Sequence, residues 1–297
     1  MKVRFAVSPG AGAVDSDHLA SLITGAEERG FDTLWFADLP LVTATNPALA
    51  VAFAAGLSHR LRLGVDLVPF GQESFVVASQ LAQLDQLTGG RLLVTLVPGL
   101  NLPGERAALG IAGRHRGRLL DSLLPELRTW WAGSAVTVGA GEAAAELTLP
   151  VLPRQNPLEV WLGGHGPQAV RRAGRLADGW LGSGAALGPH EAGELCRRIK
   201  QEAAAVGREI DREHFGLSIP YGRTNDDLSA PGLPRAVSAG GQGSAPLVPV
   251  GASALRDLVG KLVEEGMSKF VVRRIAPIAS WPDELDWLAQ AILDLQT

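Results

Sequence analysis

The sequence predicts a single (β/α)8 TIM barrel, a closed sheet of eight parallel strands surrounded by helices. Two observations lead to this fold class. Short apolar runs alternate with longer segments of helical period from one end of the chain to the other, which is typical of a parallel sheet built from βαβ units. Eight such runs can be counted within 297 residues, a length that one α/β barrel commonly occupies. We therefore expect one domain over residues 1–297.

Each predicted element has a sequence signature. The strands are apolar runs that mostly end before Gly, Pro or Asp, and they cover Val3–Ser8, Thr33–Ala37, Leu61–Val68, Leu92–Val97, Val160–Gly163, Gly179–Gly182, Phe215–Tyr221 and Lys269–Arg273. Asp15 or Ser16 is placed to cap a helix that stops at Gly30, and Asn46 precedes Pro47 at a first helical position. The other helices are predicted over Glu73–Leu87, Gly117–Trp131, Pro167–Ala177, His190–Val206, Ser253–Glu265 and Pro282–Leu295.

Two stretches interrupt the alternation. Residues 132–157 are rich in Gly, Ala and Pro, and they predict an irregular excursion or a short hairpin before the fifth strand. Residues 223–251 carry clustered Gly, Pro, Ser and Asp, which predicts a long loop after the seventh strand. Long loops in compact domains often cover a site, so a lid and a plainly disordered segment are both open interpretations.

Composition and charge exclude several classes of protein. The net charge is -4, and Lys and Arg are spread along the chain, so we expect no nucleic-acid partner. Cys196 is the single cysteine, which rules out an intrachain disulfide and predicts a packed helix position in a reducing compartment. No export signal opens the sequence, and no apolar stretch reaches the roughly 20 residues that cross a bilayer. We expect a cytoplasmic protein without a membrane segment.

A glycine-rich turn marks the expected active end of the barrel. Active sites of such barrels gather at the carboxyl ends of the strands. There the sequence VWLGGHGPQAVRRAG places Gly163, Gly164, His165 and Gly166 before a helix that begins at Pro167. Backbone N–H groups of such a turn can bind a phosphate, aided by the helix dipole; a tight turn that needs glycine for geometry alone is the alternative. A second turn, DGWLGSGAALG, follows the next strand and favours the phosphate site.

Two carboxylates stand where apolar strands reach the same end. Asp38 closes the run TLWFAD, and Asp66 interrupts LGVDLVP. A buried charge is costly unless it is paired, hydrated or used. Asp38 could instead pair with an arginine of a neighbouring loop, and a strand bulge could turn Asp66 outward. The six histidines show no metal-binding spacing, so we predict no metal site.

Five segments carry a family resemblance: AEERGFDTLWFAD (Ala26–Asp38), LRLGVDLVP (Leu61–Pro69), LDQLTGGRLLVTLVPG (Leu84–Gly99), PLEVWLGGHGPQAVRRAGRLADGW (Pro157–Trp180) and VGASALRDLVGKLVEEGMSKFVV (Val250–Val272). In order and spacing they resemble the bacterial luciferase-like flavin monooxygenases and their deazaflavin-dependent relatives, over nearly the whole chain. The resemblance implies a luciferase-like barrel that binds FMN or coenzyme F420 and oxidises or reduces a small organic substrate.

The resemblance also implies where the cofactor would bind. Its phosphate would lie between the turns after the fifth and sixth strands, next to Gly163, Gly164, His165 and Gly166 on one side and Gly182 and Ser183 on the other. In the family the end of the third strand, often bulged, backs the flavin ring, and Gly64, Val65 and Asp66 occupy that place. Members are commonly homodimers packed through early helices, and an oxygenating member would depend on a separate reductase.

One departure from the family affects the expected chemistry. Relatives often carry a histidine after the acidic residue that ends the second strand, whereas Leu39 follows Asp38 here. The usual proton donor is therefore missing or displaced, and Asp38 and Asp66 are the candidates, with Glu105 and Tyr221 behind them. FMN would support oxygenation and F420 hydride transfer. The alternative is a barrel that has lost turnover and serves as a flavin-binding or interaction protein.

Overall fold

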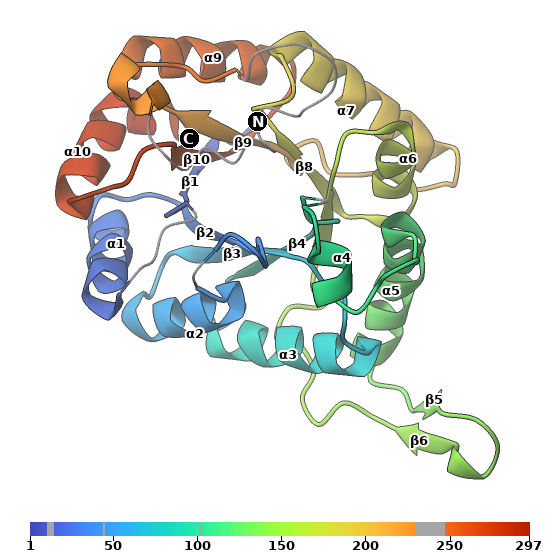
Figure 1. Ribbon diagram of the computed structural model, residues 1–297. Helices are drawn as coiled ribbons and strands as arrows, with labels where there is room; N and C mark the ends of the chain where they lie inside the picture. The colour runs from blue at the N-terminus through green and yellow to red at the C-terminus, as the bar shows by residue number, and fades with distance from the viewer. Residues whose placement is uncertain (11–14, 44, 101, 230–246) are drawn as a thin grey trace.

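Eight parallel strands close into a barrel in the computed structural model, which describes residues 1–10, 15–43, 45–100, 102–229 and 247–297 (Figure 1). The strand order round the barrel is β1-β10-β9-β8-β7-β4-β3-β2. These strands are β1 (Arg4–Val7), β2 (Thr33–Ala37), β3 (Arg62–Leu67), β4 (Leu92–Leu96), β7 (Val160–Gly163), β8 (Gly179–Ser183), β9 (Phe215–Tyr221) and β10 (Lys269–Arg274). The predicted fold class is confirmed, and each predicted strand end lies within one residue of the observed one.

Helices surround the barrel and bury its outer surface (Figure 1). They are α1 (Ser16–Glu28), α2 (Pro47–Leu57), α3 (Ser74–Leu87), α4 (Glu105–Ala108), α5 (Arg116–Trp131), α6 (Pro167–Leu176), α7 (Pro189–Ala204), α9 (Ala252–Glu264) and α10 (Trp281–Ile292). The predicted caps are confirmed: the Asp15 carboxylate accepts from the His18 N–H at 2.7 Å, and the Asn46 side chain accepts from the Ala48 N–H at 2.9 Å. The short helix α4 was not predicted, because four residues carry no readable period.

The inside of the barrel is filled by a small cluster that is separate from the core beneath the helices. The period of two along each strand sends alternate side chains inward. Trp35 lies beside Gly64 of the neighbouring strand, and a Cβ on Gly64 would collide with the Trp35 ring. Glycine is therefore what allows the indole to lie across the interior. The buried members of this cluster are Ala6, Trp35, Trp161, Leu181 and Val271.

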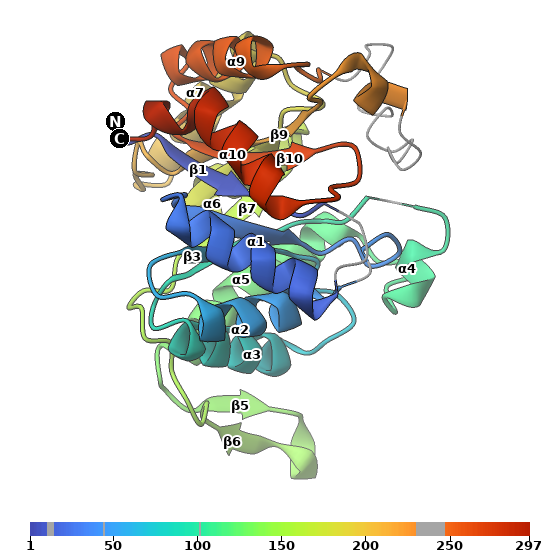
Figure 2. The ribbon, with the colours of Figure 1, turned by 90° about the vertical axis from the view of Figure 1, so that its left-hand side faces the viewer.

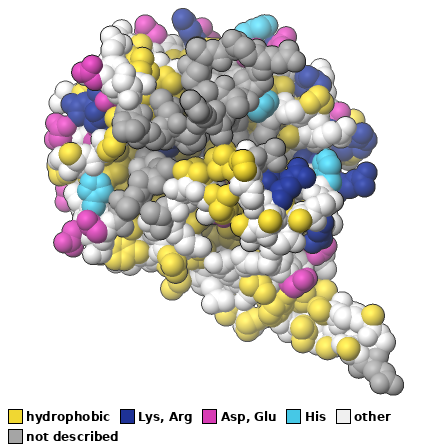
Figure 3. All heavy atoms as spheres, in the orientation of Figure 1, with side chains coloured by type: hydrophobic (Ala, Val, Ile, Leu, Met, Phe, Trp, Pro, Cys, Tyr) yellow, Lys and Arg dark blue, Asp and Glu magenta, His cyan; other side chains and the backbone are white. Residues whose placement is uncertain are grey.

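An antiparallel hairpin projects from the barrel between α5 and β7. Strands β5 (Val136–Val138) and β6 (Ala145–Leu147) form it, as predicted for residues 132–157. The hairpin stands away from the barrel in both ribbon views, and hydrophobic side chains gather on its surface (Figures 1, 2 and 3). It lies far from the carboxyl ends of the strands, so it takes no part in the site described below.

The two ends of the barrel are distinct. Both chain termini lie at the amino end, and α4 lies at the opposite end, where the strands finish (Figure 2). Of the long loop predicted after β9, Asn225–Ser229 forms a 3-10 turn. Residues 230–246, on which the lid and disorder interpretations fall, lie outside the described residues. Cys196 is buried on α7, as predicted.

We expect Gly64→Ala to lower the free energy of unfolding by about 1–3 kcal/mol, because the added methyl group would displace the Trp35 ring inside the barrel. Gly56→Ala is the matched control, since nothing lies within 4 Å of a Cβ at this position near the end of α2. The control should leave stability unchanged or raise it by up to about 1 kcal/mol. Chemical denaturation of both variants measures the difference; equal stabilities would contradict the proposed packing.

Candidate active site

The turn after β7 leaves the amino end of α6 open. Gly166 is the N-cap of α6 and makes no side-chain cap, and Pro167 occupies the first helical position. His165 and Gly166 are exposed, and their N–H groups have no hydrogen-bond partner in the described part of the chain. Unpaired donors and the positive end of the helix dipole meet here. Such a helix terminus is suited to binding an anion.

Trp180 joins the turn after β7 to strand β8. Its ring is fully buried, and its Nε1 donates to the Gly164 carbonyl oxygen at 2.8 Å. Gly164 has a φ of +108°, and a Cβ on Gly182 would collide with the Trp180 ring. Gly182 is thus accounted for by packing, and it does not face the mouth. The next residue, Ser183, is exposed at the end of β8, so its hydroxyl is the group that this turn presents.

Asp66 faces the interior of the barrel near its carboxyl end. Its Oδ1 accepts from the Trp35 Nε1 at 2.9 Å. Burial raises the pKa of Asp66 to about 7; the Trp35 hydrogen bond and the charge of Arg273 oppose this shift, and the charge of Asp38 adds to it. Thr95, its partner on β4, has a buried hydroxyl with no hydrogen-bond partner among the described residues. A carboxyl that titrates near neutrality can hold or release a proton.

Gly64 and Val65 do not reach the mouth of the barrel. Trp35 covers Gly64 from the inside, and the Val65 side chain is buried in the core beneath the helices, 1% exposed. The ladder between β3 and β4 continues in register through Asp66, so the expected bulge is absent and cannot turn Asp66 outward. Of the three residues expected to back a flavin ring, Asp66 alone points toward the mouth.

Asp38 lies next to Asp66 and caps the end of β3. Its Oδ2 accepts from the Val68 N–H at 3.0 Å, and its own N–H donates to the Asp66 carbonyl oxygen at 2.8 Å. Burial raises the pKa of Asp38; the Val68 hydrogen bond opposes the shift, and the charge of Glu105 adds to it. The Asp38 carboxylate therefore accepts from the backbone. Among the described residues it does not pair with an arginine of a neighbouring loop, which was the alternative prediction. The β2–β3 ladder brings the two predicted acids together.

Glu105 and Tyr221 are both held by partners within the fold. Glu105 is 1% exposed, forms an ion pair with Arg116 at 2.7 Å and accepts from the Leu100 N–H at 3.2 Å. Tyr221 points toward the helices, also 1% exposed, and its hydroxyl donates to Glu284 at 2.6 Å. Burial, together with the Glu284 charge, raises the pKa of Tyr221 well above its usual value. Both side chains are satisfied within the fold, which removes the reason to place them beside a substrate.

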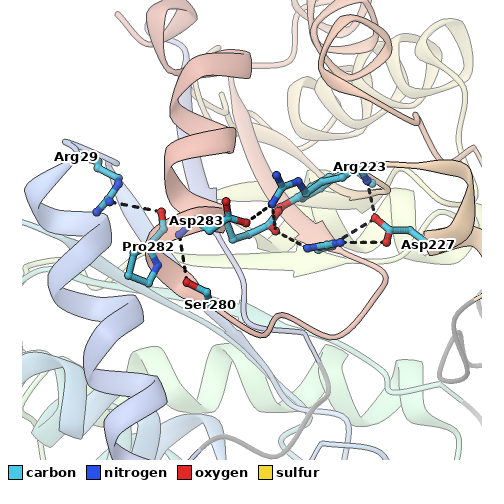
Figure 4. A network of polar contacts seen from close by, with 9 residues as sticks. Arg29, Arg223, Asp227, Ser280, Pro282 and Asp283 are labelled. Carbon is cyan, nitrogen blue, oxygen red and sulfur yellow. Dashed lines mark hydrogen bonds and ion pairs between the residues drawn. The ribbon is translucent and has the colours of Figure 1, made fainter.

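A network of ion pairs ties the carboxyl ends of β9 and β10 to α10 (Figure 4). Arg274 contacts Glu284 at 2.6 Å and Asp227 at 3.0 Å, and Arg223 contacts Asp283 at 2.6 Å. Glu284 is fully buried, and removing one partner from a buried pair is strongly destabilising. This side of the mouth is therefore held rigidly.

A cavity of about 280 Å³ does not coincide with this site. It lies at the amino end of the barrel, and Trp35 and Trp161 are among the residues that line it. Charged side chains, among them Arg4, Arg62 and Lys269, line its rim. Active sites of (β/α)8 barrels lie at the carboxyl ends of the strands. The candidate site therefore lies at that end and not at this cavity. Among the described residues, no three His, Cys, Asp or Glu side chains are grouped to hold a metal ion.

Fold and site together define a class: a (β/α)8 barrel with an open glycine-rich turn and two half-buried acids at the carboxyl ends of its strands. The family model of the luciferase-like monooxygenases matches residues 1–240. The chain belongs to this family, and the resemblance read from the sequence is confirmed. No described helix has both the length and the apolar content needed to cross a membrane.

Curated relatives are similar to this chain in sequence. The chain is 27% identical to an F420-dependent glucose-6-phosphate dehydrogenase of Nakamurella multipartita over 70% of this chain and 64% of the relative. It is 26% identical to a 5,10-methylenetetrahydromethanopterin reductase of Methanolobus tindarius over 65% of this chain and 56% of the relative. The chain thus spans less than two thirds of the length of these curated relatives.

Two solved structures share the fold at low sequence identity. An F420-dependent secondary alcohol dehydrogenase in complex with an F420-acetone adduct superposes with a TM-score of 0.80 at 16% identity, covering 100% of both chains. A long-chain alkane monooxygenase superposes with a TM-score of 0.78 at 15% identity, covering 99% of this chain and 92% of that chain. At this level of identity the likeness establishes the barrel alone.

We expect Asp66→Asn to change how stability depends on pH. The folded chain keeps the Asp66 proton up to a pKa of about 7, whereas the ordinary pKa of an aspartate is 3.8. The wild type therefore loses stability as the pH rises between these values, and its stability levels off above them. The variant lacks this loss and should be more stable at pH 8 by about 2–4 kcal/mol.

Denaturation of wild type and variant at pH 5 and pH 8 measures this effect. Asp257→Asn, on the exposed side of α9, removes the same charge from a surface position and serves as the control. A pH dependence that persists unchanged in Asp66→Asn would show that another group is responsible.

Proposed function

We propose that the protein is an oxidoreductase that binds FMN or coenzyme F420 at the mouth of the barrel and acts on a small organic substrate. The observation that carries this proposal is the open amino end of α6, whose preceding turn is joined through Trp180 to β8. Family membership supports it, because relatives named above are F420-dependent enzymes and solved neighbours include a monooxygenase.

The residues present fit the phosphate of such a cofactor. The N–H groups of His165 and Gly166 are unpaired within the described chain, and the Ser183 hydroxyl lies exposed on the adjacent strand. Gly163 and Gly164 add no side chain that would block approach, although Gly163 is itself buried. Backbone donors of this kind bind a phosphate without a positively charged side chain.

The cofactor would supply the redox chemistry, either hydride transfer with F420 or oxygen activation with FMN. The chain supplies the proton. Trp35 holds Oδ1 of Asp66, which leaves Oδ2 as the atom that carries a proton at the mouth. The neighbouring Asp38 has a raised pKa and is the second candidate, which compensates for Leu39 standing where relatives often carry histidine.

Titration of the purified chain with FMN and with oxidised and reduced F420, followed by fluorescence, tests the proposal. Binding of one of them below about 10 μM supports it, and binding of neither contradicts it. A substrate screen with the bound cofactor then separates an enzyme from the alternative, a flavin-binding barrel without turnover. The absence of histidine after Asp38 is the observation that favours this alternative.

We expect Gly166→Asp to weaken FMN binding at least tenfold while leaving the fold intact. Gly166 has a φ of -68° and nothing within 4 Å of a Cβ, and aspartate is a favoured N-cap. The new carboxylate would accept from N–H groups of the first turn of α6 and repel the phosphate.

Gly166→Asn provides the matched control, because it caps the helix equally without a negative charge and should lose less affinity. Riboflavin lacks the phosphate, so its binding should differ little between the two variants. Equal losses of FMN and riboflavin affinity would place the phosphate elsewhere.

We also propose a homodimer that packs through α2 and α3; with FMN, a separate reductase would supply reduced flavin. Leu49, Phe53 and Leu57 follow one another at intervals of four along α2 and are 69%, 38% and 38% exposed. On the neighbouring α3, Leu87 is 63% exposed and Val76 47%. An exposed apolar surface spanning two helices is typical of an interface with another protein.

We expect the double substitution Leu49→Glu and Phe53→Glu to produce a folded monomer, because two charges would be buried at the interface. Analytical ultracentrifugation of wild type and variant gives their masses. Val206→Glu, at an apolar position 44% exposed near the end of α7, should leave the wild-type mass unchanged. A monomeric wild type, or a dimeric double variant, would contradict this interface.

A further inference from the structure

The Arg273 side chain points into the barrel near the carboxyl end of β10. Its neighbour two residues earlier, Val271, belongs to the interior cluster, whereas Val272 belongs to the core beneath the helices. The alternation of a strand therefore directs Arg273 inward. The Cγ and Cδ atoms of Arg273 lie 3.8 and 4.0 Å from the position of a Cβ on Gly10. The aliphatic part of the side chain thus runs beneath the turn after β1, and its guanidinium lies within the mouth.

Arg273 differs from Arg116 and Arg274 because, among the described residues, no carboxylate lies within ion-pair distance of it. Arg116 is paired with Glu105 at 2.7 Å, and Arg274 with Glu284 at 2.6 Å. Within the described ranges, no hydrogen bond and no ion pair reaches the Arg273 guanidinium. The charge that acts on it is that of Asp66, which lies beyond ion-pair distance. Burial lowers the pKa of Arg273, and Asp66 opposes the shift.

The Arg273 side chain is half-buried, so its guanidinium is only partly hydrated, and an anion that binds it would supply the hydrogen bonds that the surrounding residues do not provide. Its planar fork of five donors matches a carboxylate or a phosphate with two parallel hydrogen bonds. In the barrel, β10 is separated from β8 by β9, and from β7 by β9 and β8. Arg273 therefore lies on a different strand from the groups assigned to the cofactor phosphate.

We propose that Arg273 binds an anionic group of the substrate, a carboxylate or a phosphate, and thereby restricts the substrates to small anions. This inference rests on the proposed function, since it takes the mouth as the place where substrate meets cofactor. An anion held there lies on the same side of the interior cluster as Asp66, the proposed proton carrier. Arg273 is then a specificity-determining residue. The sequence did not predict it, because a single arginine at a strand end belongs to no motif.

Calorimetric titration of the full chain, without added cofactor, tests the inference with three probe anions: acetate, benzoate and inorganic phosphate. Benzamide is the neutral counterpart of benzoate. We expect at least one anion to bind in the millimolar range or tighter, and benzamide at least tenfold more weakly than benzoate if benzoate is that anion. Arg273→Gln should lose at least tenfold in anion affinity, and Arg273→Lys should lose less, because it keeps the charge and forfeits the fork.

Arg62→Gln is the matched control. Arg62 lies on the rim of the cavity at the amino end of the barrel, is exposed, and should leave anion binding unchanged. Far-UV circular dichroism and melting temperature establish that the variants fold. The inference is overturned if the wild type binds none of the anions, if Arg273→Gln binds them as the wild type does, or if Arg62→Gln is the variant that loses them.

FMN and riboflavin titrations of Arg273→Gln separate the two sources of an anion. Unchanged affinity for both assigns the guanidinium to substrate, whereas loss of FMN affinity with riboflavin binding retained assigns it to the cofactor phosphate and overturns the inference. The proposed function fails separately, by the absence of FMN and F420 binding in the wild type. Anion binding to the cofactor-free chain is measured independently of that result.

Discussion

The contact between Trp35 and Gly64 inside the barrel is the constraint on which both ends of the molecule depend. The indole has room because its neighbour on β3 has no side chain. Together with Trp161 it belongs to the buried cluster inside the barrel, and both rings line the cavity at the amino end. The same indole donates to Asp66, and thus one packed ring contacts the cavity at one end and orients an acid at the other.

Polar groups around the mouth fall into two sets according to the partners that they have. Tyr221 and Glu284 join β9 and β10 to α10 on the outer side of the sheet, and Glu105 of α4 is paired with Arg116. On the inner side, Asp66 and Arg273 face a space without a full set of partners among the described residues. Polar groups withdrawn from water without hydrogen-bond partners are unfavourable. The presence or absence of partners therefore separates the charges that stabilise the fold from those available for binding and proton transfer.

The fold could be read from the sequence because its signals are local. Apolar runs such as Thr33–Ala37 and Val160–Gly163 coincide with the observed strands, and Asp15 and Asn46 cap helices as predicted. The glycine-rich turn at Gly166 also lies where expected, since a strand followed by an N-cap and proline has few other conformations. Family membership followed from the order and spacing of whole segments, which no single residue carries.

The side of the strand that each residue faces was decided only by the tertiary structure. Tyr221 and Glu105 stand near strand ends in the sequence, yet one faces the helices and the other forms a buried ion pair. Gly64 and Gly182, expected to approach a cofactor, make room for Trp35 and Trp180. By itself the sequence determined the strands, the caps and the family, because each depends on neighbours along the chain. Barrel closure brings together strands that are far apart in the sequence, and it thereby decides which acids and arginines have partners. No local sequence pattern predicts these contacts.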